Sequence, residues 1–448
     1  MRDGALPAGW TTFVLGTSCS KIGSGATPRG GASVYQESGV AFIRSQNVLN
    51  EGFSAEGLAY IDDEQAAQLQ SVEIQADDVL LNITGDSVGR VCQAPADVLP
   101  ARVNQHVAII RPWPEVLDPA YVRYYLVSGP IQNELLAMAA GGATRNALTK
   151  GMVERFEVLA PADVNDQRAI SAVLRTIDHK IELNRRTGET LEAMARALFQ
   201  SWFVDFEPVR AKGDGEPETA TCERLHLSPE LLARFPDEFA DSPVGEVPAG
   251  WGVVSLAEAS TYLSRGISPK YVESGGILVL NQRCVRDGKV DVTKGRRHDV
   301  MARAVGGREL RTGDVLVNST GVGTLGRIAQ VATLSETTVV DSHVTVVRAN
   351  EQVVPAAYMA LSLSARQNDI EALAEGSTGQ TELSRARLGA LGVLLPPGAL
   401  LTEFAGRVAP LRAASHAHDV ESRALAAARD ALLPQLLSGD LRVPLLAP

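Results

Sequence analysis

The chain has 448 residues, 45% of them hydrophobic, which is enough for two to four domains with apolar cores. Its formal net charge of −11 argues against nucleic-acid binding, although local clustering of Lys and Arg decides that question, not the total. The longest apolar runs, such as 107–110 and 277–280, are too short to span a bilayer, and the start has no signal-peptide pattern. We therefore expect a cytoplasmic protein without membrane contact.

Catalytic and metal-binding motifs are missing from the sequence. It contains no phosphate-binding loop, no dinucleotide fingerprint, no Gly-x-Ser-x-Gly elbow and no His-Glu-x-x-His pair. The Asn/Asp-Pro-Pro-aromatic tetrapeptide typical of amino-methyltransferases is also missing. The four cysteines are scattered, without the spacing of a disulfide framework or zinc site. We therefore predict no catalytic residue, no metal site and no cofactor bound to this chain.

An internal repeat organises the chain. Pro-Ala-Gly-Trp at 7–10 recurs at 248–251, an offset of 241, and the stretch 76–85 matches 312–321. The offset falls to 234 between Ile170 and Phe404, so one unit of about 200 residues is duplicated. Each copy contains short β-branched runs that predict strands, at 40–44, 79–83 and 107–111 and at 278–281, 315–318 and 344–348. Pro119 and Pro355 precede predicted helices at 121–126 and 358–363.

Each copy ends in a long predicted helix. Residues at alternating intervals of four and three form a heptad seam with a polar centre, from Ile170 to Trp202 and again from Phe404 to Leu436. A helix with one apolar seam needs a partner, and the nearest is its own duplicate. We predict an antiparallel coiled coil with the polar centres Asn184 and His418 in contact, and an end or kink at Pro434.

These elements predict an α+β fold with two duplicated mixed α/β domains, joined by two long antiparallel coiled-coil helices and related by a pseudo-two-fold axis. The acidic stretch between the copies holds 11 acidic and 4 basic residues and resembles a linker. The predicted boundaries are 1–163 for the first domain, 164–204 for the central helix, 205–247 for the acidic linker, 248–397 for the second domain and 398–440 for the C-terminal helix.

Amide and basic side chains in the predicted loops suit DNA recognition. Arg, Gln and Asn can make bidentate contacts to guanine and adenine, and they follow corresponding strands at 44–47 and 281–283. Two Gly-rich loops end in Arg90 and Arg327, and basic segments precede the last strand of each copy. Ordinary polar loops and tight turns with a solvated Arg remain alternatives. The predicted DNA-binding residues are Arg44, Gln46, Asn47, Arg90, Arg145, Asn146, Lys150, Asn281, Gln282, Arg283, Arg327, Gln380 and Arg385.

Aromatic residues are concentrated at the end of the first helix. Trp202, Phe203 and Phe206 provide more aromatic surface than one seam requires. This surface either packs against the neighbouring globular part or forms a docking site for another protein. We predict the docking site.

The sequence as a whole resembles the specificity subunit of type I restriction-modification systems. The resemblance depends on the duplicated plan together with the phrases QRAISAVLRTIDHKIELNRR, ALFQSWFVDFEPVRAK and ALLPQLLSGDL. It implies a non-catalytic subunit in which each domain reads one half of a split double-stranded DNA sequence, while the helices separate the domains and dock two methyltransferase subunits. Restriction subunits complete such a complex, and S-adenosylmethionine, ATP and Mg²⁺ are expected on the partners. A non-enzymatic scaffold with two protein-binding β domains is the alternative.

Overall fold

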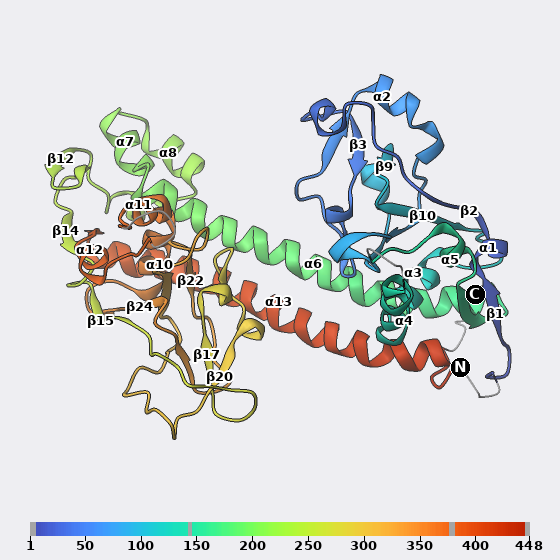
Figure 1. Ribbon diagram of the computed structural model, residues 1–448. Helices are drawn as coiled ribbons and strands as arrows, with labels where there is room; N and C mark the ends of the chain where they lie inside the picture. The colour runs from blue at the N-terminus through green and yellow to red at the C-terminus, as the bar shows by residue number, and fades with distance from the viewer. Residues whose placement is uncertain (1–5, 142–145, 376–380, 444–448) are drawn as a thin grey trace. The chain divides into compact units, whose positions relative to one another are not determined.

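The computed structural model describes residues 6–141, 146–375 and 381–443. Two helices dominate the chain, α6 (Val164–Phe203) and α13 (Gly398–Ser438) (Figure 1). The chain divides into unit 1, Met1–Leu183 with Glu421–Pro448, and unit 2, Asn184–Val420. Both boundaries fall inside the long helices, not at their ends as predicted, because each half-helix packs with the globular part beside it.

Unit 1 contains three main groups of paired strands. β1 pairs with β11, a four-stranded antiparallel sheet has the order β2-β10-β7-β8, and a three-stranded sheet has the order β6-β3-β9 with β3 and β9 parallel. The strands are β1 (Trp10–Val14), β2 (Cys19–Ser24), β3 (Val40–Ile43), β4 (Val48–Leu49), β5 (Gly52–Phe53), β6 (Ala59–Ile61), β7 (Val79–Asn82), β8 (Val91–Gln93), β9 (Ala101–Val103), β10 (Val107–Pro112) and β11 (Glu157–Pro161). The short helices are α1 (Leu15–Ser18), α2 (Asp63–Gln68), α3 (Pro119–Val127), α4 (Gly129–Ala140) and α5 (Lys150–Glu154).

Unit 2 has corresponding strand orders, with one additional strand, β16, in its second sheet. β14 pairs with β25, one four-stranded sheet has the order β15-β24-β21-β22, and another has the order β16-β20-β17-β23 with β17 and β23 parallel. Its strands are β12 (Phe239–Ser242), β13 (Gly245–Pro248), β14 (Gly252–Ser255), β15 (Ser260–Arg265), β16 (Tyr271–Val272), β17 (Ile277–Leu280), β18 (Val285–Arg286), β19 (Lys289–Val290), β20 (Arg296–His298), β21 (Val315–Asn318), β22 (Ile328–Gln330), β23 (Thr338–Val340), β24 (Val344–Ala349) and β25 (Gly392–Leu395). Its short helices are α7 (Glu207–Gly213), α8 (Glu218–Leu225), α9 (Pro229–Leu232), α10 (Ala356–Ala365), α11 (Gln367–Ala372) and α12 (Arg385–Gly389). The predicted strands and the two Pro-initiated helices are confirmed.

The central strands β7 and β21 are apolar at every position except the last, because both of their faces are buried. In β7, Val79 and Leu81 belong to the core beneath α3 and α4, whereas Leu80 belongs to the core shared with the three-stranded sheet. In β21, Val317 and Leu316 divide in the same way. Alternate residues of a strand point to opposite faces, so a continuous apolar run indicates a strand between two layers. These layers hold the strand ends where the candidate loops begin.

The long helices run antiparallel where they meet in unit 2. Nδ1 of His418 lies 3.1 Å from Oδ1 of Asn184, and nearer the start of α13 the Arg412 guanidinium lies 3.7 Å from the Glu192 carboxylate. Positions that rise along α6 therefore meet positions that fall along α13. The predicted contact between the two polar centres is confirmed. Further apolar contacts follow the predicted seam, and Trp202 packs on Phe404.

The segment 205–247 is folded, so the prediction of a linker is wrong. Its helices α7, α8 and α9 bury apolar side chains such as Leu231 and Phe235. The Phe235 ring lies 5.4 Å from the Trp202 ring, in the same core. The acidic composition misled the prediction because the charged residues occupy the exposed side of these helices while a few apolar ones anchor them.

Pro434 does not end α13, which continues to Ser438. Proline prevents one backbone hydrogen bond, and a helix tolerates this loss within about one turn of its end. The residue after the helix, Gly439, has a φ of +79°, a conformation that favours glycine. Within the described residues, no helix is both long and apolar enough to cross a membrane.

Candidate nucleic-acid interface

One buried asparagine ends the central strand of each unit and holds one of the candidate loops beside it. Asn82, at the end of β7, donates from Nδ2 to the Ser45 carbonyl at 2.8 Å, and Asn318, at the end of β21, donates to the Gln282 carbonyl at 2.9 Å. Both asparagines are fully buried. The sequence analysis did not select them, although each occupies the same place in the repeat. They attach the turns 45–47 and 282–284 to a rigid strand end.

A Gly-rich loop leaves the same strand end in each unit. Thr84 Oγ1 lies 2.6 Å from His106 Nδ1, and Thr320 Oγ1 lies 2.7 Å from His343 Nδ1, so each loop is fastened to the entry of the neighbouring strand. Gly85 and Gly321 have φ angles of +77° and +104°. Side chains with a Cβ rarely adopt such angles, which explains why glycine follows the threonine in both copies.

A third segment reaches the same place. Thr84 forms an isolated β-bridge with Ala147, and Thr320 forms one with Glu382. In each unit the structure therefore brings together the turn after β3 or β17, the Gly-rich loop, a histidine and the segment before the last strand. These are the segments that the sequence selected as candidates for DNA recognition.

In unit 1, the predicted residues of the turn divide into exposed and structural ones. Gln46 is exposed, and its Nε2 donates to the Gly57 carbonyl at 3.1 Å. Asn47 is fully buried and donates from Nδ2 to the Ser54 carbonyl at 2.9 Å. Its side chain holds the turn and has no surface for a base, so the structure contradicts the predicted base contact by Asn47. Arg44 is half-buried and donates to the Gly57 carbonyl at 2.6 Å.

The corresponding turn of unit 2 divides in the same way. Asn281 is half-buried and caps the turn, because its Oδ1 accepts the Arg283 backbone N–H at 2.8 Å. Gln282 is half-buried and Arg283 is exposed. Each turn therefore carries one glutamine and one asparagine that holds the backbone, but Gln46 is the second residue of its turn and Gln282 the first.

The remaining predicted residues lie on the loops around these turns. Arg90 is exposed and Arg327 is half-buried, each directly after a Gly-rich loop. Asn146 is exposed beside the Ala147 bridge, Lys150 begins α5 and lies 3.5 Å from Glu154, and Arg385 begins α12 with its side chain exposed. Arg145 and Gln380 lie outside the described residues.

A buried ion pair braces the start of each central strand. Arg111 of β10 bonds to Asp78 at 2.7 Å, and Arg348 of β24 bonds to Asp314 at 2.7 Å. Both aspartates are completely shielded from solvent. The hydrogen bond with Asp314 raises the pKa of Arg348 above its ordinary value, against the effect of burial. These pairs fix the register of strands that end in the recognition loops, and a buried charge requires such a partner.

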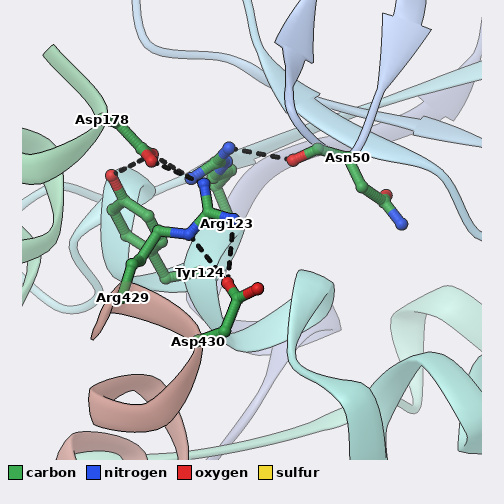
Figure 2. A network of polar contacts seen from close by, with 6 residues as sticks. All are labelled: Asn50, Arg123, Tyr124, Asp178, Arg429 and Asp430. Atoms are coloured by element: carbon green, nitrogen blue, oxygen red, sulfur yellow. Dashed lines mark hydrogen bonds and ion pairs between the residues drawn. The ribbon is translucent and has the colours of Figure 1, made fainter. Parts of the chain in front are cut away.

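A polar network fastens the globular part of unit 1 to both long helices (Figure 2). Asp178 of α6 accepts from Arg123 at 2.8 Å, from the Tyr124 hydroxyl at 2.7 Å and from Arg429 of α13 at 2.8 Å. Arg123 also donates to the Asn50 carbonyl at 3.0 Å. Burial raises the pKa of Tyr124, so this hydroxyl is a permanent donor. The network explains why a charged residue, Arg429, lies on the seam of α13, since Arg429 neutralises Asp178 of α6.

The aromatic end of α6 is a core and not a surface. Trp202 is 1% exposed and Phe203 5% exposed, and the Phe203 ring lies 4.9 Å from Phe404 and 5.0 Å from Tyr358. Phe206 is half-buried, 5.9 Å from Trp251. The structure contradicts the predicted docking role of Trp202 and Phe203 because their rings fill the interior of unit 2. The alternative of packing against the neighbouring globular part is the one the structure favours.

The described ranges hold no group of three or more His, Cys, Asp or Glu side chains placed to bind a metal ion.

Comparison with known proteins supports the resemblance found in the sequence. No family model matches the chain. It is 22% identical to the HindI specificity subunit of a type I restriction enzyme from Haemophilus influenzae, over 90% of this chain and 94% of the relative. It is also 22% identical to the MjaIX specificity subunit from Methanocaldococcus jannaschii, over 98% of this chain and 95% of the relative. The resemblance to type I specificity subunits is therefore confirmed.

The fold agrees with that of a solved structure. The S subunit of a type I restriction-modification system from M. genitalium matches with a TM-score of 0.58 over 100% of this chain and 99% of that chain, at 14% identity. The α+β fold with long helices is thus shared with a specificity subunit.

Proposed function

We propose that this chain is the DNA-recognition subunit of a type I restriction-modification complex and that it reads a bipartite double-stranded target. The observation that carries the proposal is the repetition of one recognition frame, in which a buried asparagine, Asn82 or Asn318, holds a turn that presents Gln46 or Gln282. Glutamine can bond both major-groove atoms of adenine. Two frames on one chain suit a target with two specific halves.

In this proposal the chain catalyses nothing itself. Two methyltransferase subunits dock on it and use S-adenosylmethionine, and restriction subunits supply ATP- and Mg²⁺-dependent cleavage. The long helices separate the two readers and carry the docking surface. Because Trp202 and Phe203 are buried, that surface is placed on the exposed faces of α6 and α13.

Mapping of methylated adenines tests the two-reader proposal. We expect the full chain, expressed with its methyltransferase partner, to direct methylation to one split sequence. Gln46→Ala should relax or weaken one half of that sequence and Gln282→Ala only the other. Loss of one bidentate pair corresponds to about 1–3 kcal/mol of discrimination at one base position.

Matched controls come from glutamines at the opposite end of the same sheets. Gln75 precedes β7 and Gln352 follows β24, and both are exposed. Gln75→Ala and Gln352→Ala should leave the methylated sequence unchanged. If the variants at 46 and 282 relax both halves equally, the two-reader proposal is wrong, and if the complex methylates no specific sequence, DNA recognition itself is wrong.

A further inference from the structure

An apolar side chain stands fully in solvent at the tip of the Gly-rich loop of unit 2. Val322 is 86% exposed, and the glycines on either side of it, Gly321 and Gly323, have φ angles of +104° and +70°. A valine in water leaves its apolar surface uncovered, and burying that surface is favourable. The side chain is therefore available to be covered by something that this chain binds.

The loop that carries Val322 is braced at both ends. The backbone N–H groups of Thr324 and Leu325 donate to the Gly321 carbonyl at 3.2 and 3.0 Å, and the Gly326 N–H donates to the Asn318 carbonyl at 2.8 Å. Thr324 Oγ1 also donates to the Thr320 carbonyl at 3.3 Å. Such bonds fix the direction of the tip before binding, which lowers the entropy cost of a contact made there.

Val322 lies beside the amide that reads bases in the proposed function. A Cβ added at Gly321 would lie 2.8 Å from Oε1 and 2.9 Å from Nε2 of Gln282, so the Gln282 side chain crosses the base of this tip. Thr320 Oγ1 lies 3.4 Å from Gln282 Oε1 on the same side. The Gln282 amide, in the turn after β17, therefore lies against the base of the loop after β21 that carries Val322.

This pair of side chains has the chemistry of an A·T step in the major groove. Adenine offers N7 and N6 to an amide, and thymine offers an apolar C5-methyl group that side chains such as Ala and the Thr methyl contact. A protein partner fits less well, because a stable protein interface buries about 800 Å² per partner and is built around several anchors. Phosphate contact is excluded for a hydrocarbon side chain.

We propose that Val322 is a specificity-determining residue that covers the C5-methyl group of a thymine in the half-site read by unit 2. This inference rests on the proposed function and adds to it the base that is read, thymine, and the group that is contacted, its C5-methyl. The corresponding loop of unit 1 carries Asp86 at its tip, exposed and charged. A carboxylate cannot cover a methyl group, so this thymine contact belongs to unit 2 alone.

Replacing thymine by deoxyuridine removes only the methyl group and tests the proposal directly. The full chain with its methyltransferase partner is titrated with the target duplex found by methylation mapping, in which each thymine of one half-site is replaced in turn. At one position of the half-site that Gln282→Ala relaxes, deoxyuridine should weaken binding by about three- to tenfold, the scale of one methyl group removed from contact. Replacements in the other half-site should have no effect that depends on residue 322.

The variant Val322→Ser separates this contact from the rest of the interface. It should weaken binding to the thymine duplex to the level that the wild type shows with deoxyuridine, and it should no longer distinguish the two duplexes. Because residue 322 is exposed, folding is not at risk, and an unchanged melting temperature checks this. The inference is overturned if the unit 2 half-site contains no thymine, or if Val322→Ser and deoxyuridine weaken binding independently. Failure of sequence-specific binding in the wild type would instead overturn the proposed function.

Discussion

Asp341 and Asn104 occupy the same place in the two copies of the repeat and differ mainly in charge. Each side chain accepts the backbone N–H two residues later, His343 to Asp341 at 2.9 Å and His106 to Asn104 at 3.1 Å. Asp341 is 4% exposed and Asn104 7%. Burial raises the pKa of the Asp341 carboxyl, while the bond from His343 opposes that shift. The structural role needs an acceptor oxygen but no charge.

Asp341→Asn should therefore stabilise unit 2 at neutral pH. A carboxyl whose pKa is higher in the folded state contributes most stability while protonated, and that contribution is lost as pH rises through the folded pKa. We expect the variant to melt about 2–4 °C higher at pH 7, which corresponds to about 1 kcal/mol in a unit of this size. The gain should shrink as pH falls toward the ordinary Asp pKa of about 3.9. A variant less stable at every pH would show that the carboxylate charge is used. Asn104→Asp in unit 1 is the reverse control and should destabilise at pH 7.

At the residue scale, the sequence could identify which loops matter but not which side chains face outward. Gln46 and Asn47 are adjacent and equally suited to bases by residue type, yet one is exposed and the other fully buried. Their difference depends on the path of the backbone from 44 to 57, which residue type does not specify. Asn82 and Asn318 escaped selection because an asparagine at the end of an apolar strand is equally typical of an ordinary turn.

At the scale of elements, Asp178 joins two helices and a domain through one carboxylate. Asp178→Asn keeps the shape of the side chain but leaves Arg123, whose side chain is 8% exposed, without its counter-charge. We expect a loss of about 2 kcal/mol in the free energy of unfolding of unit 1, below the 3–5 kcal/mol of a fully buried pair because Asp178 is 23% exposed. Hydrogen exchange should locate the loss, with weaker protection of amides in α3 and near 429.

The exposed pair of Lys150 and Glu154 is the control for Asp178. It lies at i and i+4 with both side chains largely in solvent, so Glu154→Gln should cost no more than about 0.5 kcal/mol. Equal losses in the two variants would mean that the network in Figure 2 is as weak as a surface ion pair.

Elements with a clear sequence pattern were predictable and those without one were not. The seam of α6 and α13 follows from its heptad spacing, and the strands buried on both faces follow from short β-branched runs bounded by turn residues. The segment 205–247 has neither pattern, since its short helices are held by a few anchors such as Leu231 and Phe235. Composition then dominated the prediction, and an acidic composition suggested a linker.

At the scale of the whole molecule, the repeat predicted two copies of one mixed α/β domain, and the four-stranded sheets β2-β10-β7-β8 and β15-β24-β21-β22 have corresponding orders. It could not show where one unit ends and the next begins. The boundary falls within α6 and α13 because packing, and not the order of the chain, assigns each half-helix to a unit. The partners proposed for the exposed helix faces leave no mark in the spacing of the seam.

The net charge of −11 makes salt dependence a decisive test for the whole chain. Each phosphate neutralised by Lys or Arg releases counterions, so the logarithm of the binding constant falls with the logarithm of salt with a slope of about −0.9 per contact. The six predicted basic residues outside the turn of unit 1, Arg90, Arg145, Lys150, Arg283, Arg327 and Arg385, give an expected slope of about −5.

Binding of the target duplex, measured at salt concentrations from about 50 to about 200 mM, gives that slope. Arg385→Gln should make it shallower by about one while leaving the methylated sequence unchanged, because a phosphate contact positions the protein and specifies no base. Gln282→Ala, which removes no charge, should leave the slope intact and alter the sequence. A slope near zero would favour the scaffold with two protein-binding domains, since an acidic chain that contacts no phosphates has no counterions to release.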